Sequence, residues 1–436
     1  MKGSSAQYLH DRAAQGRPIT LGLIGVGQMG AGIVAQSAHL PGIKIRVLAD
    51  IDPERARRSV ARLGIVDPLV TDDPDDAAQA AGSGRTVITT DAELVPHLPL
   101  DVVVEATGIP EVGVRVGLAA AHAKRNLVSM NVEADVTIGR FLRREFELSG
   151  AVYTLAAGDE PSCAWELVDF ARTIGLDVVV AGKGKNNPLR ANATPSSVAD
   201  EAERKKMNPR MLAAFVDGTK TMCEMCCLAN ATGFRPDVPG MHGPDANSAD
   251  LASVFKLREE GGLLSQTGVV DYVTGDVAPG VFVVVHSDDE EIVRDLNYLQ
   301  LGPGPYWALV RPYHLANLEV PMTIVRVVRD GSPTLAPVHR VAEVAAKAKR
   351  DLRPGDRVEG IGDEQVLGFT YSASDFDDLG LVPLGLTEHA MVVKPVTVGD
   401  PLTFDDVELD ESSALVRAWY LQQHLDRLDG YGELAG

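Results

Sequence analysis

Three glycines with the spacing Gly-x-Gly-x-x-Gly occur at residues 25–30 of the 436-residue chain. The apolar run 19–24 comes directly before them, and a helical pattern over residues 29–40 follows. In a strand–turn–helix unit, such glycines permit the tight turn, let a phosphate approach the backbone, and let the helix pack against the strand. The free N–H groups at the start of the helix then attract the phosphates. The predicted dinucleotide contacts at this turn are Gly25, Gly27, Gln28, Met29 and Gly30.

Asp50 ends the second apolar run, twenty residues after the last glycine. A carboxylate at this point of a strand–turn–helix unit binds the adenosine ribose. Its charge favours NAD, because it repels a 2′-phosphate, whereas Arg55, Arg57 and Arg58 on the next helix would favour NADP. The choice between the two cofactors stays open, and so does the alternative of a glycine turn without a ligand. Together the turn and Asp50 favour an oxidoreductase that uses a nicotinamide dinucleotide.

Polar residues also follow the next two strands of the predicted sheet, 102–105 and 127–130. Ligands of open α/β sheets bind beyond the carboxyl ends of the strands. These residues are therefore expected to line the nicotinamide half of the site, and capping of the strands is the alternative. They are Thr107, Gly108, Asn131 and Glu133.

Two lysines, Lys183 and Lys185, lie with two asparagines in a predicted polar loop over residues 182–188. In a chain with a net charge of −20, such a group indicates a pocket for an anion or an oxyanion. A lysine beside a carbonyl group stabilises the alkoxide that hydride transfer produces. The alternative is a solvated loop.

Asp217, Lys220 and Glu224 are spaced three and four residues apart in a predicted helix over residues 209–231. This spacing puts them on one face of an otherwise apolar, buried helix. Unpaired buried charge is unfavourable, so the three side chains are expected to face a site rather than form a surface stripe. Lys220 would donate a proton or stabilise charge, and the two acids would tune its pKa or bind a substrate hydroxyl.

Asp159 and Glu160 are adjacent acids at the end of another predicted strand. They suit a divalent cation such as Mg²⁺ or Mn²⁺, or they cap the helix that follows. His242 and His314 are further acid–base candidates, although a lone histidine is more often structural.

The elements that position these residues change in type along the chain. Residues 18–157 alternate strands with helices, which predicts an α/β domain with a doubly wound parallel sheet that binds NAD(P). Residues 158–330 contain a strand, a long helix and glycine-rich loops of the kind that usually carry a site, which predicts an α+β catalytic domain. Residues 331–436, with short strands and turns, predict a small β-rich domain.

Composition excludes several classes of function. The 61 acidic residues against 41 basic ones disfavour nucleic acid and anionic membranes as partners. Neither a signal peptide nor a transmembrane run stands out, so a cytoplasmic protein is expected. The four cysteines, three of them within residues 223–227, form no disulfide framework and are expected to be structural.

Several segments resemble known families. The first 330 residues resemble the homoserine-dehydrogenase-like oxidoreductases, and the tail resembles SAF domains at residues 352–356 (LRPGD) and 382–386 (VPLGL). A closer resemblance is to the 1-deoxy-D-xylulose 5-phosphate reductoisomerase-like (DRL-type) proteins. It rests on residues 130–136 (MNVEADV), 182–188 (GKGKNNP), 215–221 (FVDGTKT) and 311–315 (RPYHL).

The resemblance implies a Rossmann domain, a central catalytic and oligomerisation domain and a C-terminal SAF domain in a homo-oligomer. It also implies NADPH-linked chemistry, with NADH as the alternative, on a small polyhydroxylated carbonyl compound, phosphorylated or not, of isoprenoid biosynthesis. A divalent cation would polarise the carbonyl. Two other functions stay open: an alcohol dehydrogenase for a small hydroxy acid or sugar acid, and a non-catalytic dinucleotide sensor.

Overall fold

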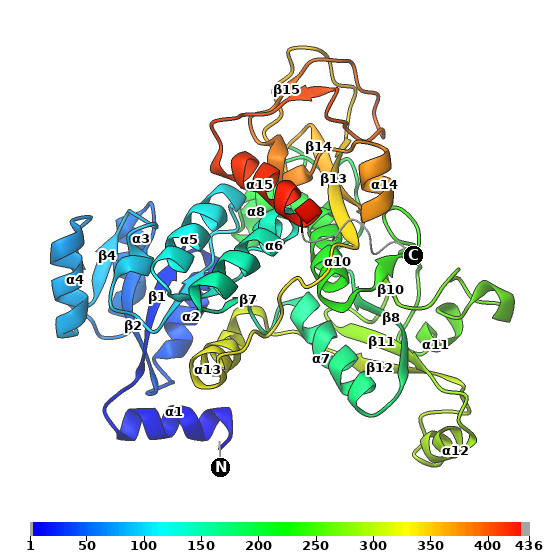
Figure 1. Ribbon diagram of the computed structural model, residues 1–436, viewed down its shortest axis with the longest axis horizontal. Coiled ribbons are helices and arrows are strands. Elements are labelled where there is room, and N and C mark those ends of the chain that lie inside the picture. Colours follow the sequence, from blue (N-terminus) through cyan, green and yellow to red (C-terminus); the bar gives the residue numbers. More distant parts are fainter. Residues whose placement is uncertain (1–2, 429–436) are drawn as a thin grey trace. The chain divides into compact units, whose positions relative to one another are not determined.

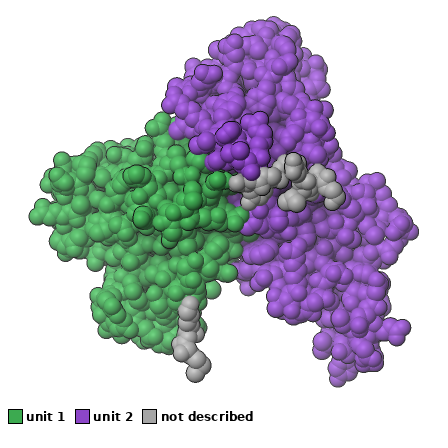
Figure 2. Space-filling view, viewed as in Figure 1, with its two compact units in different colours: residues 1–159, 315–336 green, residues 160–314, 337–436 purple. Residues whose placement is uncertain are grey.

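The computed structural model describes residues 3–428, and its elements are labelled in Figure 1. The chain forms two compact units, coloured in Figure 2. Unit 1 contains residues 1–159 and 315–336, and unit 2 contains residues 160–314 and 337–436. The division into three domains at residues 157 and 330 stays a prediction.

Unit 1 is built on a seven-stranded parallel sheet. In chain order its strands are β1 (Ile19–Ile24), β2 (Ile43–Ala49), β3 (Leu69–Val70), β4 (Val87–Thr89), β5 (Val102–Glu105), β6 (Asn126–Ser129) and β7 (Tyr153–Leu155). They are arranged in the order β3-β4-β2-β1-β5-β6-β7. Without the two-residue edge strand β3, this is the 3-2-1-4-5-6 order of the Rossmann fold. The predicted doubly wound sheet is therefore confirmed.

The helices of unit 1 follow the predicted alternation with strands. They are α1 (Ser5–Ala14), α2 (Gln28–Ser37), α3 (Pro53–Ala61), α4 (Pro74–Ser83), η1 (Val95–His97), α5 (Pro110–His122), α6 (Val132–Ser149), η3 (Ala316–Leu318) and α13 (Val320–Asp330). Helix α13 comes from late in the chain, yet its Ile324 lies in the same buried cluster as Leu23 of β1. The Thr323 hydroxyl accepts a hydrogen bond from the Ala157 N–H at 2.7 Å, which fixes the end of the sheet.

Unit 2 contains a mixed five-stranded sheet. Its strands are β8 (Asp177–Gly184), β9 (Arg235–Pro236), β10 (Val269–Val273), β11 (Val281–His286) and β12 (Tyr306–Arg311), in the order β12-β11-β8-β10-β9. The central strand β8 runs parallel to β10 and antiparallel to β11. Figure 1 shows helices α7 (Glu160–Thr173) and α10 (Thr219–Thr232) beside these strands. The other helices of this part are α8 (Ala199–Lys205), α9 (Pro209–Val216), α11 (Leu251–Val254), η2 (Arg258–Glu260) and α12 (Glu290–Tyr298).

Two local predictions in unit 2 are wrong. The predicted helix over residues 209–231 is interrupted at Asp217 and Gly218, because Gly218 takes a left-handed conformation with φ +97°. Asp217 therefore ends α9 and does not share a helix face with Lys220 and Glu224. The predicted loop also starts later than expected, since β8 continues through Lys183 to Gly184.

The C-terminal part of unit 2 contains the predicted short strands. Strand β13 (Ala342–Ala348) pairs antiparallel with β14 (Val366–Ser372), and β15 (Met391–Val392) pairs with β16 (Val407–Glu408). Helices α14 (Ala373–Asp378), η4 (Leu384–Thr387) and α15 (Ala414–Leu428) accompany them. The Gly368 N–H of β14 donates to the Thr219 hydroxyl of α10 at 2.8 Å, so this segment packs against the central helix.

The four cysteines are buried, and their structural role stays a prediction. Among residues 3–428, no helix combines the length and the apolar character that a membrane span requires.

Candidate functional site

A buried cluster of charged side chains lies at the centre of unit 2. Strand β8 supplies Lys183, the first turn of α7 supplies Glu160, and α10 supplies Glu224. The Lys183 Nζ donates to the Glu160 Oε1 at 2.6 Å and also to the Glu224 Oε2. The three side chains are 5%, 7% and 2% exposed. Two carboxylates and one ammonium thus share a site that water scarcely reaches.

The pKa values in this cluster follow from burial and from the neighbouring charges. Burial alone lowers the pKa of Lys183, but the charges of Glu160 and Glu224 outweigh it, so its pKa lies above the usual value. Burial and the charge of Glu160 raise the pKa of Glu224, against the opposing effects of Lys183 and Lys220. Lys183 is therefore a fixed cation, and Glu224 is a carboxylate poised to take up a proton.

Lys185 follows directly after β8 and is also buried. Its Nζ donates to the Phe215 carbonyl oxygen at 2.9 Å, at the end of α9. Burial and the charge of Lys183 lower the pKa of Lys185 to about 8, although Asp217 and Glu224 oppose the change. A lysine with this pKa exchanges its proton near neutral pH, as a general acid must.

Asp217 and Lys220 lie next to this cluster in different ways. The Asp217 carboxylate forms a fully buried ion pair with Lys349, at 2.7 Å, and accepts a hydrogen bond from the Thr219 N–H at 2.8 Å. Lys220 is half-buried on α10, one turn before Glu224, and its charge lowers the pKa of that acid. Lys349 is not among the site residues predicted from the sequence. In the sequence, the feature that could have indicated it is a lysine directly after the predominantly apolar run 342–348.

Three ligand atoms suited to a divalent cation gather at the start of α7. Atoms of Asp159, Glu160 and His314 lie within 4.8 Å of one another. The His314 Nε2 is 3.4 Å from the Glu160 Oε1. Carboxylate oxygens with one imidazole suit Mn²⁺ or Mg²⁺ by donor type. The predicted acid pair thus gains His314 as a neighbour, and the metal itself stays a prediction.

His242, the other histidine candidate, contacts a different set of residues. Its ring Nε2 lies 2.8 Å from the Asp237 Oδ2, and its backbone N–H donates to the Asp271 Oδ2 at 3.1 Å. Burial raises the pKa of Asp271 to about 6, against three backbone hydrogen bonds. These contacts attach the loop before Pro244 to β10. They agree with a structural role for His242, the alternative to an acid–base role.

In unit 1 the glycine turn has the geometry of a phosphate-binding turn. Gly25 has φ +87°, and a Cβ at Gly30 would overlap the Gly25 carbonyl oxygen. A Cβ at Gly27 would meet nothing within 4 Å, so this position opens onto free space. Gly27 caps α2 without a side-chain hydrogen bond, which leaves the N–H groups of Gln28 and Met29 for a ligand.

Asp50 lies against the glycine turn. Its Oδ2 accepts a hydrogen bond from the Val26 N–H at 2.8 Å, and its Oδ1 accepts one from the Asp52 N–H at 2.9 Å. A carboxylate has about four acceptor positions, so both oxygens retain capacity for ribose hydroxyls. The Arg55 Nη1 lies 3.5 Å from the Asp50 Oδ1 and offsets its charge.

The remaining predicted residues of unit 1 cluster at the ends of β5 and β6. The Glu105 Oε1 accepts hydrogen bonds from both the N–H and the hydroxyl of Thr107, and burial raises the pKa of Glu105. Asn131 caps α6 through the Ala134 N–H at 3.0 Å and is wholly buried. Gly108 has a left-handed φ of +66°, and Glu133 is buried in the first turn of α6. Whether these residues line a nicotinamide site stays a prediction.

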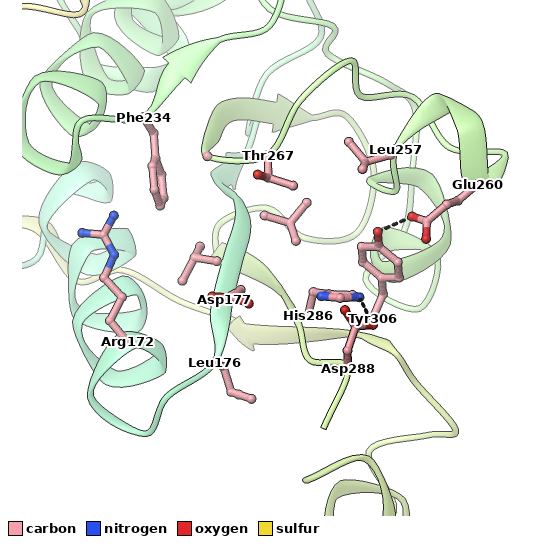
Figure 3. Close-up of a pocket in the computed structure, with 13 residues that line it drawn as sticks. Arg172, Leu176, Asp177, Phe234, Leu257, Glu260, Thr267, His286, Asp288 and Tyr306 are labelled. Carbon is pink, nitrogen blue, oxygen red and sulfur yellow. Dashed lines mark hydrogen bonds and ion pairs between the residues drawn. The ribbon is translucent and has the colours of Figure 1, made fainter. Parts of the chain in front are cut away.

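A cavity of about 530 Å³ lies in unit 2 near the first residues of β8. Figure 3 shows Arg172 and Phe234 on one side, and Glu260, Tyr306, His286 and Asp288 on the other. Several of these side chains already have partners: Tyr306 donates to Glu260, and the His286 Nε2 lies 3.3 Å from Asp288. None of the residues predicted for a site lines this cavity. The candidate catalytic site is therefore the Lys183 cluster, near the other end of the strand.

A family model described as "Oxidoreductase DRL, catalytic domain" matches residues 158–320. Every residue of the Lys183 cluster lies inside this range, and Lys349 lies outside it. No curated protein matches the chain. The chain therefore carries an oxidoreductase catalytic domain and is an enzyme, as predicted, which disfavours the non-catalytic sensor.

Solved structures with some likeness to the chain are dehydrogenases and reductoisomerases. A probable dehydrogenase from Thermotoga maritima is 14% identical over 72% of this chain and 90% of its own, with a TM-score of 0.40. A myo-inositol dehydrogenase from Corynebacterium glutamicum is 11% identical, over 72% and 89%, with a TM-score of 0.40. The 1-deoxy-D-xylulose 5-phosphate reductoisomerase from Zymomonas mobilis, in complex with NADPH, is 12% identical, over 72% and 82%, with a TM-score of 0.38. Likeness at this level establishes no shared substrate, and the fold assignment rests on the strand order.

Proposed function

We propose that the protein is an NADPH-dependent reductase of the reductoisomerase kind, which acts on a small, polyhydroxylated and phosphorylated carbonyl compound. The first candidate substrate is 1-deoxy-D-xylulose 5-phosphate, and NADH is the alternative cofactor. The observation that carries the proposal is Lys183, which is held as a buried cation between Glu160 and Glu224 within the oxidoreductase catalytic domain. In a chain of net charge −20, a local cation is needed to hold an anionic substrate.

The two lysines stabilise the charge that reduction creates. When bound, the reduced nicotinamide supplies a hydride to the carbonyl carbon, and the oxygen becomes an alkoxide. The fixed charge of Lys183 stabilises this oxygen, and Lys185 donates the proton that completes the alcohol. A pKa of about 8 lets Lys185 give up that proton and regain it from water within each cycle.

The two carboxylates handle the hydroxyl groups of the substrate. In a carbon-skeleton rearrangement, a base removes a hydroxyl proton and that oxygen forms a carbonyl. In the same step a carbon–carbon bond of the hydroxyl-bearing carbon shifts to the neighbouring carbonyl carbon, and the oxygen of that former carbonyl takes up a proton, so nothing is oxidised or reduced. Glu224 suits the role of the base, because burial and Glu160 raise its pKa and make the carboxylate a stronger proton acceptor. Glu160 orients the Lys183 ammonium in the same step.

Asp159, Glu160 and His314 are the residues that would hold a divalent cation. Such a cation would polarise the substrate carbonyl and fix the adjacent hydroxyl oxygen. The Lys183 ammonium, 2.6 Å from Glu160, competes for the same carboxylate, so we expect modest affinity for the cation until an anionic substrate adds its own oxygens.

The dinucleotide is assigned to unit 1. Support comes from the free N–H groups of α2 behind Gly27 and from Asp50 beside the turn. The arginine next to Asp50, Arg55, provides a partner for a 2′-phosphate, which favours NADPH.

The test is turnover by the purified full chain with NADPH and 1-deoxy-D-xylulose 5-phosphate, with Mg²⁺ or Mn²⁺ present. NADPH oxidation is followed by absorbance, and ¹³C NMR of the labelled product reports the carbon skeleton. A rearranged, reduced product supports the proposal. If neither NADPH nor NADH is oxidised with this substrate or with related sugar phosphates, the proposal fails.

A second candidate is an alcohol dehydrogenase for a small hydroxy acid or sugar acid. Asp50 favours it, because a buried carboxylate beside the ribose position suits NAD, the usual oxidant in such reactions. The same NMR experiment separates the two functions, because an alcohol dehydrogenase leaves the carbon skeleton unchanged.

A further inference from the structure

Lys349 is a buried cation from the C-terminal part of the chain, outside the range that the family model matches. Its side chain is 1% exposed, and its Nζ lies 2.7 Å from the Asp217 Oδ2. The same ammonium donates to the Ala193 carbonyl at 2.9 Å and to the Asp363 carbonyl at 2.8 Å. Three oxygens thus surround one nitrogen, which fixes its position.

The partner of Lys349 controls the turn between α9 and α10. While one Asp217 oxygen pairs with Lys349, the other accepts the Thr219 N–H at 2.8 Å and so begins α10, the helix that carries Lys220 and Glu224. Two residues before Asp217, the Phe215 carbonyl accepts the hydrogen bond of Lys185. One short turn therefore contacts Lys185 and starts the helix of Glu224.

We propose that Lys349 is a positioning residue of the candidate active site: by fixing Asp217 it holds the turn at residues 215–218, and thereby places Lys185. On this proposal the described C-terminal segment, residues 337–428, contributes to the candidate active site through Lys349. The catalytic meaning of this role rests on the function proposed above, but the placement of Lys185 does not.

The charged groups around Lys185 predict how the loss of Lys349 changes the pKa of Lys185. Lys183 lowers the pKa of Lys185, whereas Asp217 on the turn and Glu224 on α10 raise it. Without Lys349, the Asp217 carboxylate loses the cation with which it is paired, and its charge then acts more strongly on the Lys185 ammonium. The Lys185 ammonium is then held more strongly, and its pKa rises.

The first experiment measures this titration directly and needs no substrate. The full chain is labelled with ¹³C-lysine, and the Cε resonance of Lys185, identified by its absence from Lys185→Met, is followed against pH. In Lys349→Met we expect the Lys185 pKa to rise by about one pH unit, the size of change that a nearby opposite charge causes. An unchanged or lowered pKa overturns the proposal.

The matched control is Lys347→Met. Lys347 belongs to the same segment, but its Nζ lies 4.1 Å from the centre of the Phe369 ring and pairs with none of the site residues named above. This variant loses the same charge two residues away, and the Lys185 titration should be unchanged. If Lys347→Met moves the titration as far as Lys349→Met does, the effect is one of net charge, and the proposal fails.

A second variant covers the case in which Lys349→Met does not fold. Asp217→Asn/Lys349→Met removes both charges of the buried pair and leaves no unpaired carboxylate. Because Asp217 is then no longer charged, the Lys185 pKa should fall below its wild-type value. A double variant that titrates like the wild type overturns the proposal.

The kinetic counterpart uses the substrate of the proposed function. Lys349→Met should lower kcat more than it raises KM, and the high-pH limb of kcat/KM should move up together with the Lys185 titration. If no substrate is turned over by any form, the proposed function fails while the NMR result still decides the role of Lys349. If substrate is turned over but the high-pH fall of kcat/KM does not shift together with the Lys185 pKa measured by NMR, the proposed role of Lys349 fails and the proposed function does not.

Discussion

The Lys183 Nζ lies 2.6 Å from the Glu160 Oε1, in a place where both side chains are at most 7% exposed. Glu224 contacts the same ammonium from α10. Taking charges out of water is unfavourable, so such a pair is stable only when each charge keeps its partners. The arrangement thus holds a cation and two carboxylates together at a position that is largely closed to water.

Replacing Lys183 should affect stability and activity together. Lys183→Met leaves two buried carboxylates without their cation, which should cost about 3–5 kcal/mol in the free energy of unfolding. Lys183 lowers the pKa of Glu224, so removing it raises that pKa further. Folded Glu224 then keeps its proton to a higher pH in the variant than in the wild type, and the loss of stability should grow as pH rises through the wild-type folded pKa. Urea unfolding between pH 5 and pH 8 measures this. If Lys183→Met is as stable as the wild type at both pH 5 and pH 8, the ion pairs of Lys183 with Glu160 and Glu224 do not stabilise the fold.

The pH dependence of the rate should report Lys185. If its ammonium form donates the proton, kcat/KM should be constant below about pH 8, the pKa that burial gives this lysine, and fall tenfold per pH unit above it. Lys185→Arg keeps the charge but cannot lose its proton in this range, so its profile should stay flat at a reduced rate. A wild-type limb that persists in this variant would assign the titration to another group.

Two glycine substitutions should separate cofactor binding from folding. A Cβ at Gly27 meets nothing within 4 Å, so Gly27→Ala should keep the thermal midpoint but place a methyl group where the pyrophosphate approaches. Gly30→Ala, whose Cβ would overlap the Gly25 carbonyl, should lose stability as well. Calorimetric titration with NADPH and thermal unfolding give both quantities. Wild-type NADPH affinity in Gly27→Ala would remove the turn from the binding site.

Arg55 should contribute to the choice between the two cofactors. Arg55→Ala should weaken NADPH binding about tenfold, which corresponds to about 1.4 kcal/mol and is modest for a charged hydrogen bond. NADH should bind as before, because it has no 2′-phosphate. Arg57→Ala is the control, since Arg57 pairs with Glu54 at 3.2 Å rather than with Asp50. Equal losses for NADPH and NADH would argue against a phosphate contact.

Removal of divalent cations should abolish turnover if Glu160 and His314 hold a metal. Treatment with a chelator should stop NADPH oxidation, and Mn²⁺ or Mg²⁺ should restore it. His314→Gln should raise the cation concentration needed for half-maximal rate about tenfold or more, since loss of one ligand weakens a small site. Full activity in the presence of the chelator would exclude the metal from the reaction.

The sequence determined the parts of the protein that depend on local spacing. The glycine turn, Asp50 twenty residues later and the alternation of strands with helices predicted the Rossmann sheet of unit 1, because a strand–turn–helix unit is encoded by neighbouring residues. Lys183 was also predicted as a site residue, from its place in a polar lysine–asparagine segment, and Glu224 from its charge on an apolar helix. The contact between the two was not predicted.

Only the tertiary structure decided which charges meet. Gly218 interrupts the expected helix and turns Asp217 away from Glu224, toward Lys349, which lies 132 positions later in the sequence. Lys183 proved to lie within a buried strand rather than in an open loop. Pairings of this kind come from the packing of distant segments, and burial makes them obligatory because a charge removed from water needs an opposite charge beside it. Residue types and local spacing do not show which distant segments pack together, so the Asp217–Lys349 pair could be found only in the tertiary structure.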